Sequence, residues 1–397
     1  MYCTHHIVRF FASLSAALSL EAGREPPRRN QTIAINSGEA PFGFVGCTSL
    51  ASVGDLCLFH RVRAPSSEPL EILRGCDITF GNLEGPFVRG GDTSDKWTVI
   101  GQEPGIAREY AKMGFHVMSV ANNHMFDYGL DGFLTTLDML DKVGIRHVGG
   151  GRDLEEAAAA LRLDRGSLRV AFLGCASTLP GDSAASAHKP GVAPLRVRAL
   201  HYVDLEMERE QPGTPPVIFT EPDEDDLERM RKAIRRAREV ADYIVVSIHW
   251  GVAYQEQVVD YQPRVGRSFI DSGADLVVGH HPHRLQGIER YRNGLIFYSL
   301  GNFFFERHGL KPRSTKWRHW PPKVGMWEQS DDSFILKSVL KPGEEAAHEL
   351  IPISRDSSGP PFLLKGARAR RLLAHLSSLS EGRGVRLSVK DCRATIE

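Results

Sequence analysis

The chain has 397 residues, of which 42% are hydrophobic and 25% are charged, as is usual for a globular protein. Lysine plus arginine and aspartate plus glutamate each number 49, so the formal net charge is zero. A neutral chain lacks the basic footprint that nucleic-acid binding needs, which argues against nucleic acid as the main partner. Six scattered cysteines without a Cys-x-x-Cys pair favour free buried thiols over a disulfide framework.

The first 41 residues are predicted to be a tail and linker. The apolar run from Phe10 to Leu20 is interrupted by serines and is shorter than the about 20 residues that span a bilayer. The run fits either a weak secretory signal or an extended tail. The signal is weak because no clear small-residue cleavage site follows the run. No other stretch is long and apolar enough to cross a membrane, so we expect no transmembrane span.

From Phe42 onward, short apolar runs alternate with amphipathic stretches, which predicts α/β layering in a single domain, 42–397. Glycines follow the first two predicted helices and are typical of helix ends. In the first half, we predict strands at Leu50–Leu58, Asp77–Phe80, Phe115–Ala121, Ile145–Val148 and Leu168–Gly174, and helices at Ile106–Met113 and Leu130–Leu140.

Residues 176–222 are rich in Ser, Pro, Gly and Ala and are predicted to be an insertion beside the site. The α/β pattern then resumes and ends in a closing segment. The elements predicted there are helices at Leu227–Ala241, Val265–Ile270 and Leu363–Ser380, strands at Tyr243–Ile248, Leu276–Val278 and Leu295–Ser299, and an edge strand at Ser333–Leu340. The last helix would pack through Leu372, Leu373 and Leu376.

Polar side chains gather at or just beyond the ends of the predicted strands. They are Asp55, Glu84, Asn123, His124, His249, His281 and His283. Ligands collect at the carboxyl ends of strands in open α/β sheets, so these distant residues could meet in one crevice. Carboxylate, amide oxygen and imidazole are ligands of Zn²⁺, Mn²⁺ and Fe, and six such groups suffice for two adjacent sites.

Each of these signals also has a plainer interpretation. A lone histidine is more often a hydrogen-bonded core residue or a surface residue than a metal ligand, and an Asn-Asn pair is typical of a turn. Glu84 fits a surface carboxylate as well as a ligand, and Asp127 could cap the helix that starts near Gly129. His280 could only pack or hydrogen-bond, and Cys57 is predicted to be a small buried side chain. The basic run Lys311–Arg318 fits a solvated loop better than a site for a polyanion.

The stretch Asn123-His124-Met125-Phe126-Asp127-Tyr128-Gly129 resembles the Asn-His-x-Phe-Asp-Tyr-Gly stretch of 5′-nucleotidases, which are metallophosphatases. Further stretches resemble the CapA family of poly-γ-glutamate capsule synthesis, and the resemblance covers most of the chain from Phe42. These stretches are Gly81-Asn82-Leu83-Glu84, Ser119-Val120-Ala121-Asn122-Asn123-His124, Pro190-Gly191-Val192-Ala193-Pro194-Leu195, Ile248-His249-Trp250-Gly251, Gly279-His280-His281-Pro282-His283 and Tyr298-Ser299-Leu300-Gly301-Asn302-Phe303.

The resemblance implies a four-layer α/β/β/α sandwich of the calcineurin-like metallophosphatase type. It implies divalent metal ions (Mn, Zn, Fe or Mg) as cofactors. If both metal sites are occupied, the centre holds two ions. The implied ligands are Asp55 and His283 for the first metal, Asn123, His249 and His281 for the second, and Glu84 in the bridging position. His124 would face the substrate as a general acid, oriented by Asp127.

Two positions depart from the fold's usual motifs. Cys57 stands where an Asp-x-His motif has its histidine, and Asn82-Leu83-Glu84 stands where Gly-Asp is usual. The first metal is therefore expected to be weakly held or absent.

Two hypotheses on function follow. The first is a phosphoesterase-type hydrolase linked to capsule or poly-γ-glutamate metabolism, acting with activated water and a histidine acid. The alternative is a non-catalytic factor that helps to assemble or export an anionic capsule polymer. The expected partners are an anionic polymer or phosphoester and components of a capsule synthase, and the location is either the cytoplasm or the cell envelope and exterior.

Overall fold

The structure is a computed structural model that describes residues 46–62, 67–96, 98–306, 311–312, 330–356 and 359–397. The described residues belong to one compact unit, Phe42–Glu397. The predicted tail and most of the basic run Lys311–Arg318 lie outside the described residues. In the part of the chain that the structure describes, no helix has both the length and the apolar character needed to span a membrane.

The larger sheet has ten strands, and β1 lies in its interior. Its main order is β21-β22-β19-β18-β1-β2-β4-β5, with β16 paired to β1 and β20 paired to β19. β1 runs parallel to β2 and β16 and antiparallel to β18. The strands are β1 (Thr48–Cys57), β2 (Ile78–Leu83), β4 (Val117–Ser119), β5 (Arg146–Val148), β16 (Asn302–Phe305), β18 (Ser333–Leu340), β19 (Ala347–Ser354), β20 (Phe362–Leu363), β21 (Leu387–Lys390) and β22 (Arg393–Ile396).

The second sheet has six strands in the order β14-β15-β13-β12-β8-β7, and its central strands β8, β12, β13 and β15 are parallel. These central strands are fully covered on both faces, which is why they read as nearly continuous apolar runs. The strands are β7 (Leu161–Arg165), β8 (Leu168–Ala176), β12 (Tyr243–His249), β13 (Leu276–His280), β14 (Ile288–Tyr291) and β15 (Gly294–Phe297).

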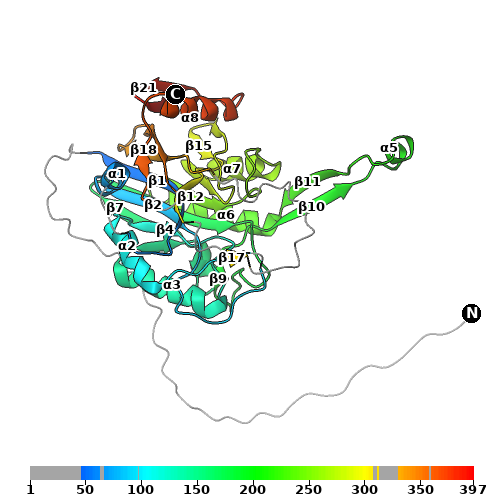
Figure 1. Ribbon diagram of the computed structural model, residues 1–397, viewed down its shortest axis with the longest axis horizontal. Helices are drawn as coiled ribbons and strands as arrows, with labels where there is room; N and C mark the ends of the chain where they lie inside the picture. Colours follow the sequence, from blue (N-terminus) through cyan, green and yellow to red (C-terminus); the bar gives the residue numbers. More distant parts are fainter. Residues whose placement is uncertain (1–45, 63–66, 97, 307–310, 313–329, 357–358) are drawn as a thin grey trace, which may run out of the picture. The chain divides into compact units, whose positions relative to one another are not determined.

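The two sheets pack face to face, and helices cover their outer faces (Figure 1). Between the sheets, Phe80 of β2 stacks on Phe172 of β8 with ring centroids 5.4 Å apart. Helices α2 (Ala107–Lys112) and α3 (Gly129–Val143) share a core with the outer face of the larger sheet, and α6 (Glu224–Arg238) and α7 (Tyr261–Asp271) share one with the smaller sheet. The four-layer α/β/β/α sandwich predicted from the resemblance is confirmed.

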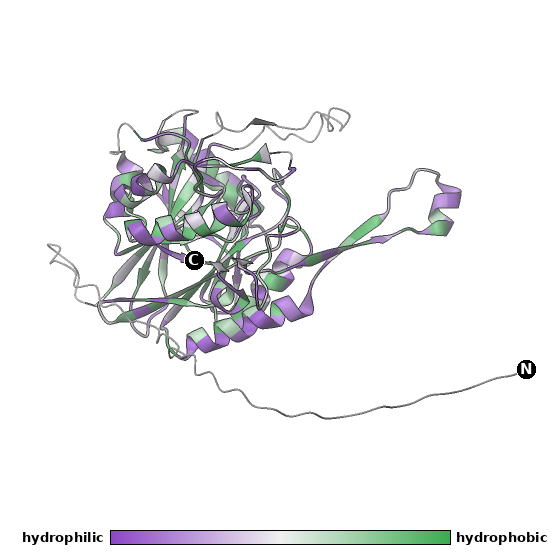
Figure 2. Cartoon of the chain, turned by 90° about the horizontal axis from the view of Figure 1, so that it is seen from below, coloured by the Kyte–Doolittle hydropathy of each residue, from purple (hydrophilic) through white to green (hydrophobic). Residues whose placement is uncertain are grey.

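The apolar faces that the sequence predicted are the buried ones (Figure 2). In that view both the strands and the helices carry apolar and polar segments. The closing helix α8 (Gly366–Leu379) buries the predicted Leu372, Leu373 and Leu376. The remaining elements are α1 (Glu68–Arg74), β3 (Thr98–Val99), a 3₁₀ turn (Pro104–Ile106), β6 (Gly150–Gly151), α4 (Leu154–Ala158), β9 (Gly191–Val192), β10 (Val197–Tyr202), α5 (Leu205–Glu210), β11 (Val217–Pro222) and β17 (Lys311–Pro312).

One strand prediction is wrong in its placement. The strand Ser333–Leu340 forms as predicted, but it is not at an edge, because it pairs with β1 on one side and β19 on the other. Its nearly uninterrupted burial reflects that interior position. Within the segment 176–222, which is predicted to be an insertion, β10 and β11 form a two-stranded antiparallel hairpin.

Candidate metal centre

Two glycines let the strand ends of the site come close together. A Cβ added to Gly54 would lie 1.9 Å from the carbonyl oxygen of Gly301, and one added to Gly279 would lie 2.1 Å from that of Tyr298. The amide of Asp55 donates to the Gly301 carbonyl at 3.0 Å. Glycine is therefore required where β1 and β13 approach these backbone segments, and the close approach brings Asp55 to the site.

Asp55 lies fully buried near the carboxyl end of β1. Its Oδ1 accepts a hydrogen bond from Asn82 Nδ2 at 2.9 Å and lies 3.1 Å from His280 Nδ1. Burial alone would raise the pKa of this carboxyl, but His280, His283 and the Asn82 amide outweigh it and hold the pKa below its ordinary value. Asp55 is thus a buried anion.

Glu84 follows β2 and is also fully buried. Neither of its carboxylate oxygens has a hydrogen-bond partner among the described residues. Nε2 of His283 lies 3.4 Å from Oε1 of Glu84, and Nε2 of His124 lies 3.8 Å from the same oxygen. A buried carboxylate without donors is unstable unless a cation balances it. The surroundings of Glu84 therefore fit a ligand better than the alternative of a surface carboxylate.

His249 ends β12 and His281 follows β13, and their ring centroids lie 4.8 Å apart. Nε2 of His249 lies 2.8 Å from Oδ1 of Asn123. Burial, reinforced by neighbouring histidines, holds the pKa of His249 well below its ordinary value and lowers that of His281 to about 3. Both rings are therefore neutral near pH 7, which is the state in which imidazole binds metals.

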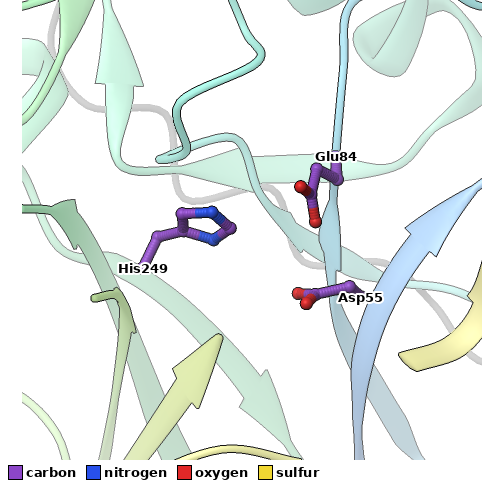
Figure 3. Close-up of side chains that lie close together, drawn as sticks. All are labelled: Asp55, Glu84 and His249. Carbon is purple, nitrogen blue, oxygen red and sulfur yellow. The ribbon is translucent and has the colours of Figure 1, made fainter. Parts of the chain in front are cut away.

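Ligand atoms of Asp55, Glu84 and His249 all lie within 4.8 Å of one another (Figure 3). The three side chains come from three different strand ends and point toward one common space. Two oxygen ligands and one neutral imidazole form a donor set suited to Mn²⁺, Zn²⁺ or Fe, and these residues could hold a divalent ion.

His283 lies between the two carboxylates. Its Nδ1 is 2.9 Å from Oδ1 of Asn302 and 3.4 Å from Oδ2 of Asp55, while Nε2 faces Glu84. Burial lowers the pKa of His283, but Glu84 and Asp55 outweigh burial and raise it to about 10. His281 and His283 have φ angles of 95° and 53°, a region that non-glycine residues rarely occupy. Such strain clusters at functional sites.

His124 and Asp127 form a pair at the mouth of the site. Nδ1 of His124 lies 2.6 Å from Oδ2 of Asp127, and the same oxygen accepts from the amide of Ile100 at 2.7 Å. Asp127 is fully buried and does not cap α3, whose preceding residue Tyr128 makes no side-chain cap. The carboxylate therefore fixes the histidine ring and leaves Nε2 facing the cluster.

Lys96 is a site residue that the sequence did not reveal. Its Nζ donates to Oδ1 of Asp127 at 2.5 Å and to the carbonyl of Asn123 at 2.6 Å, and it lies 3.4 Å from His124 Nδ1. Lys96 belongs to the loop between β2 and β3, away from any strand end. No regular spacing marks it, so only the folded chain brings it to the pair.

The structure brings together all of the side chains that we singled out at the strand ends. Asn122 and Asn82 add a connecting network, because Asn122 Nδ2 donates to Asn82 Oδ1 at 3.2 Å and to the Leu83 carbonyl at 2.8 Å. Cys57 is buried in an apolar cluster with Ile100 and Phe305, as predicted for a small apolar side chain. Burial, together with Glu84, raises the pKa of the Cys57 thiol well above its ordinary range. A neutral thiol is a poor metal ligand.

Comparison with known proteins places the chain in a family. A family model described as "Bacterial capsule synthesis protein PGA_cap" matches residues 36–307, which is more than half of the chain. The chain belongs to this family. The resemblance to CapA proteins is thereby confirmed.

Three relatives illustrate the similarity. The "Capsule biosynthesis protein CapA" of Bacillus anthracis is 26% identical, over 82% of this chain and 69% of that protein. The "PGA biosynthesis protein CapA" of Bacillus subtilis (strain 168) is 27% identical, over 82% and 73%. The "Uncharacterized protein y4sH" of Sinorhizobium fredii (strain NBRC 101917 / NGR234) is 31% identical, over 72% of each chain.

Among solved structures, this PGA_cap protein is similar to a "Putative 5'-Nucleotidase from Staphylococcus aureus". The identity is 13% and the TM-score is 0.43, over 84% of this chain and 58% of that one. A similarity this low says nothing about activity.

Proposed function

We propose that this protein is a divalent-metal-dependent hydrolase of the phosphoesterase type that acts in capsule or poly-γ-glutamate metabolism. The observation that carries the proposal is the convergence of Asp55, Glu84 and His249 on one buried space, with both oxygens of Glu84 lacking donors. A divalent cation at this place would balance the negative charge of the buried carboxylates and would bind the Glu84 oxygens, which accept no hydrogen bond from the described residues.

In the proposed assignment, Asp55 and His283 would hold one metal, and Asn123, His249 and His281 would hold a second. Glu84 would be a ligand shared by the two sites, as the resemblance implies. When bound, such ions supply a Lewis acid that lowers the pKa of water and neutralises charge on a phosphoryl group. The neutral state of His249 and His281 fits this role, because their ring nitrogens offer lone pairs without first losing a proton. His283, whose pKa is raised to about 10, would have to release a proton as the metal binds.

His124 would handle the proton on the leaving group. Its Nδ1 is engaged with Asp127, so Nε2 is the atom that can give a proton to the leaving oxygen. Lys96 holds the second oxygen of Asp127 and thus fixes the pair in place. The side chain of His124 is 11% exposed, so part of the ring can be reached from the solvent.

The biological setting comes from the relatives, whose names refer to capsule and PGA biosynthesis. Relatives in Mycobacterium tuberculosis, 28% identical, carry the name "Probable polyglutamine synthesis accessory protein". We therefore place this chain beside the machinery that makes an anionic polymer, with a phosphoester or the polymer itself as substrate.

A second candidate is a non-catalytic factor for assembly or export of such a polymer. The buried, apolar setting of Cys57 favours it, because the histidine that usually completes the first metal site is missing there. With only Asp55, Glu84 and His283 available, the first metal would be held weakly.

Turnover of a generic aryl phosphate by the purified chain with added Mn²⁺ separates the two candidates. The hydrolase predicts turnover that chelation abolishes and that His124→Ala lowers by roughly 10²-fold or more with metal content intact. The matched control is His375→Ala on the exposed face of α8, which should leave turnover unchanged. Absence of turnover with two bound metals per chain would refute the hydrolase, and absence with one metal or none would favour the assembly factor.

A further inference from the structure

The hairpin formed by β10, α5 and β11, here called the hairpin arm (residues 197–222), carries a concentration of exposed apolar side chains. Eight large hydrophobic residues on it are between 40% and 64% exposed. They are Leu200, Tyr202, Val203, Leu205, Met207, Val217, Ile218 and Phe219. Figure 2 shows apolar segments along the ribbon of this hairpin. Soluble surfaces rarely expose so many large apolar side chains together, and such a patch marks a contact site.

We propose that the hairpin arm is the interface through which two copies of this chain associate. The hairpin is anchored at its base, where the amide of Asp223 donates to the Arg196 carbonyl at 2.7 Å and the amide of Tyr261 in α7 donates to Thr220 Oγ1 at 3.3 Å. The apolar residues beyond this base are about half exposed among the described residues, and a second copy of the chain would cover part of this exposed area.

The exposed area matches what a stable dimer needs. A large side chain can bury ~150–250 Å², and these residues are about half exposed, so each presents about 100 Å² to the solvent. The eight residues together present on the order of 800 Å². A standard interface buries about 800 Å² on each partner. The hairpin arm alone therefore offers enough surface for a specific dimer.

The strand β11 is also complementary to a copy of itself. Among the described strands, β10 and β11 pair only with each other, so each has one edge whose amide and carbonyl groups no described strand pairs with. If two copies of β11 pair antiparallel about a two-fold axis at Ile218, Val217 of each copy lies opposite Phe219 of the other. The side chains of the three consecutive apolar residues then contact those of the other copy side by side, and the two hairpins form one four-stranded sheet.

The composition of the tip argues against a lipid surface as the partner. Residues 204–210 hold four acidic residues and one arginine, a net charge of about −3 at neutral pH. An anionic membrane would repel this tip, and hydrocarbon could not satisfy the free edge of a hairpin. Leu200 and Phe219 are cross-strand neighbours, as are Tyr202 and Val217, so one face of the hairpin is continuously apolar, as a protein–protein contact requires.

Sedimentation velocity of the full chain over about 1–50 µM tests the proposal. The unaltered chain should sediment as a dimer, and the double substitution Ile218→Lys with Phe219→Lys should weaken dimerisation by roughly 30-fold or more. The matched control, Val240→Lys with Val389→Lys, changes two valines that are 45% and 49% exposed outside the hairpin arm and should leave the dimer intact.

Cross-linking locates the contact. Under mild oxidation Ile218→Cys should give a covalent dimer, because residue 218 lies at the two-fold axis, whereas Val389→Cys should not exceed the background of the native cysteines. A chain that stays monomeric at 50 µM, or a double-lysine variant as dimeric as the unaltered chain, would overturn the proposal. So would a monomer that floats with vesicles of phosphatidylcholine and phosphatidylglycerol, because lipid would then be the partner.

Discussion

Replacing Glu84 by glutamine probes the role of the buried carboxylate whose oxygens lack donors. The substitution keeps the side-chain volume and removes the negative charge that faces His283 at 3.4 Å. If Glu84 is a metal ligand, the main effect is on metal affinity. The fold should survive, because the Glu84 backbone amide still donates to the Leu56 carbonyl.

The size of the effect follows from mass action. At a free metal concentration of 100 times Kd, a bound ion stabilises the unaltered chain by about 2.7 kcal/mol. Loss of a metal-site partner costs ~10–100-fold in affinity, which leaves a gain of only about 0.4–1.4 kcal/mol in the variant. At about 2 °C per kcal/mol for a large domain, the Mn²⁺-induced rise in Tm should fall from about 5 °C to about 1–3 °C.

The assay is a thermal melt of each variant with chelator and with Mn²⁺, read as the difference between the two midpoints. This difference cancels any change in metal-free stability. Glu289→Gln is the control, because Glu289 is equally buried but is bound to Arg267 and Tyr298. That variant should melt earlier and keep the full Mn²⁺ shift. A full shift in Glu84→Gln would show that Glu84 does not bind the ion, and the reasoning from its unpaired oxygens would fail.

Three further outcomes follow from the structure. Lys96→Met should lower kcat of aryl phosphate hydrolysis by roughly 3–10-fold, which is less than the effect of His124→Ala, because His124 and Asp127 keep their own 2.6 Å hydrogen bond. An unchanged kcat would remove the lysine from the mechanism. Gly54→Ala should lower the free energy of unfolding in urea by about 3 kcal/mol or more, since the added Cβ would meet a carbonyl oxygen at 1.9 Å. Gly181→Ala is the control and should cost little, because the space around Gly181 is open. Equal losses in the two variants would contradict the close approach at Gly54. Burial lowers the pKa of His348 to about 4 in the folded chain, so between pH 6.5 and 4 the unfolded chain binds a proton that the folded chain does not, and stability falls as pH falls. Comparing urea unfolding at pH 7 and pH 5, His348→Gln should lose about 2 kcal/mol less than the unaltered chain; equal losses would show that His348 titrates normally in the fold.

Much of the fold could be predicted because the stretches that are apolar in the sequence are the ones that the folded chain buries. The apolar runs Tyr243–Ile248 and Leu276–Val278 became the buried parallel strands β12 and β13, each a residue or two longer than predicted. The site residues followed from the same logic, since parallel strands carry whatever follows them to one edge of a sheet. Asp55 and His249 are near neighbours although almost two hundred positions separate them in the sequence.

What the sequence did not reveal depends on the neighbours that a segment acquires only in the folded chain. Ser333–Leu340 has the composition of a strand, but only its pairing with β1 and β19 decides that it is interior. Lys96 lies in a loop without periodicity, and its contact with Asp127 exists only after folding. The apolar run Val217–Phe219 is typical of a buried strand, yet these residues are about half exposed, because β10 is the only described strand that pairs with β11.

Anomalous diffraction from crystals grown with Mn²⁺, recorded near the manganese absorption edge, tests the metal assignment most directly. The predicted result is one or two peaks between Asp55, Glu84 and His249, each about 2.0–2.3 Å from a ligand oxygen or nitrogen. Occupied manganese elsewhere with no peak at these residues, or no peak at all despite saturating metal, would contradict the proposed metal centre and the hydrolase built on it.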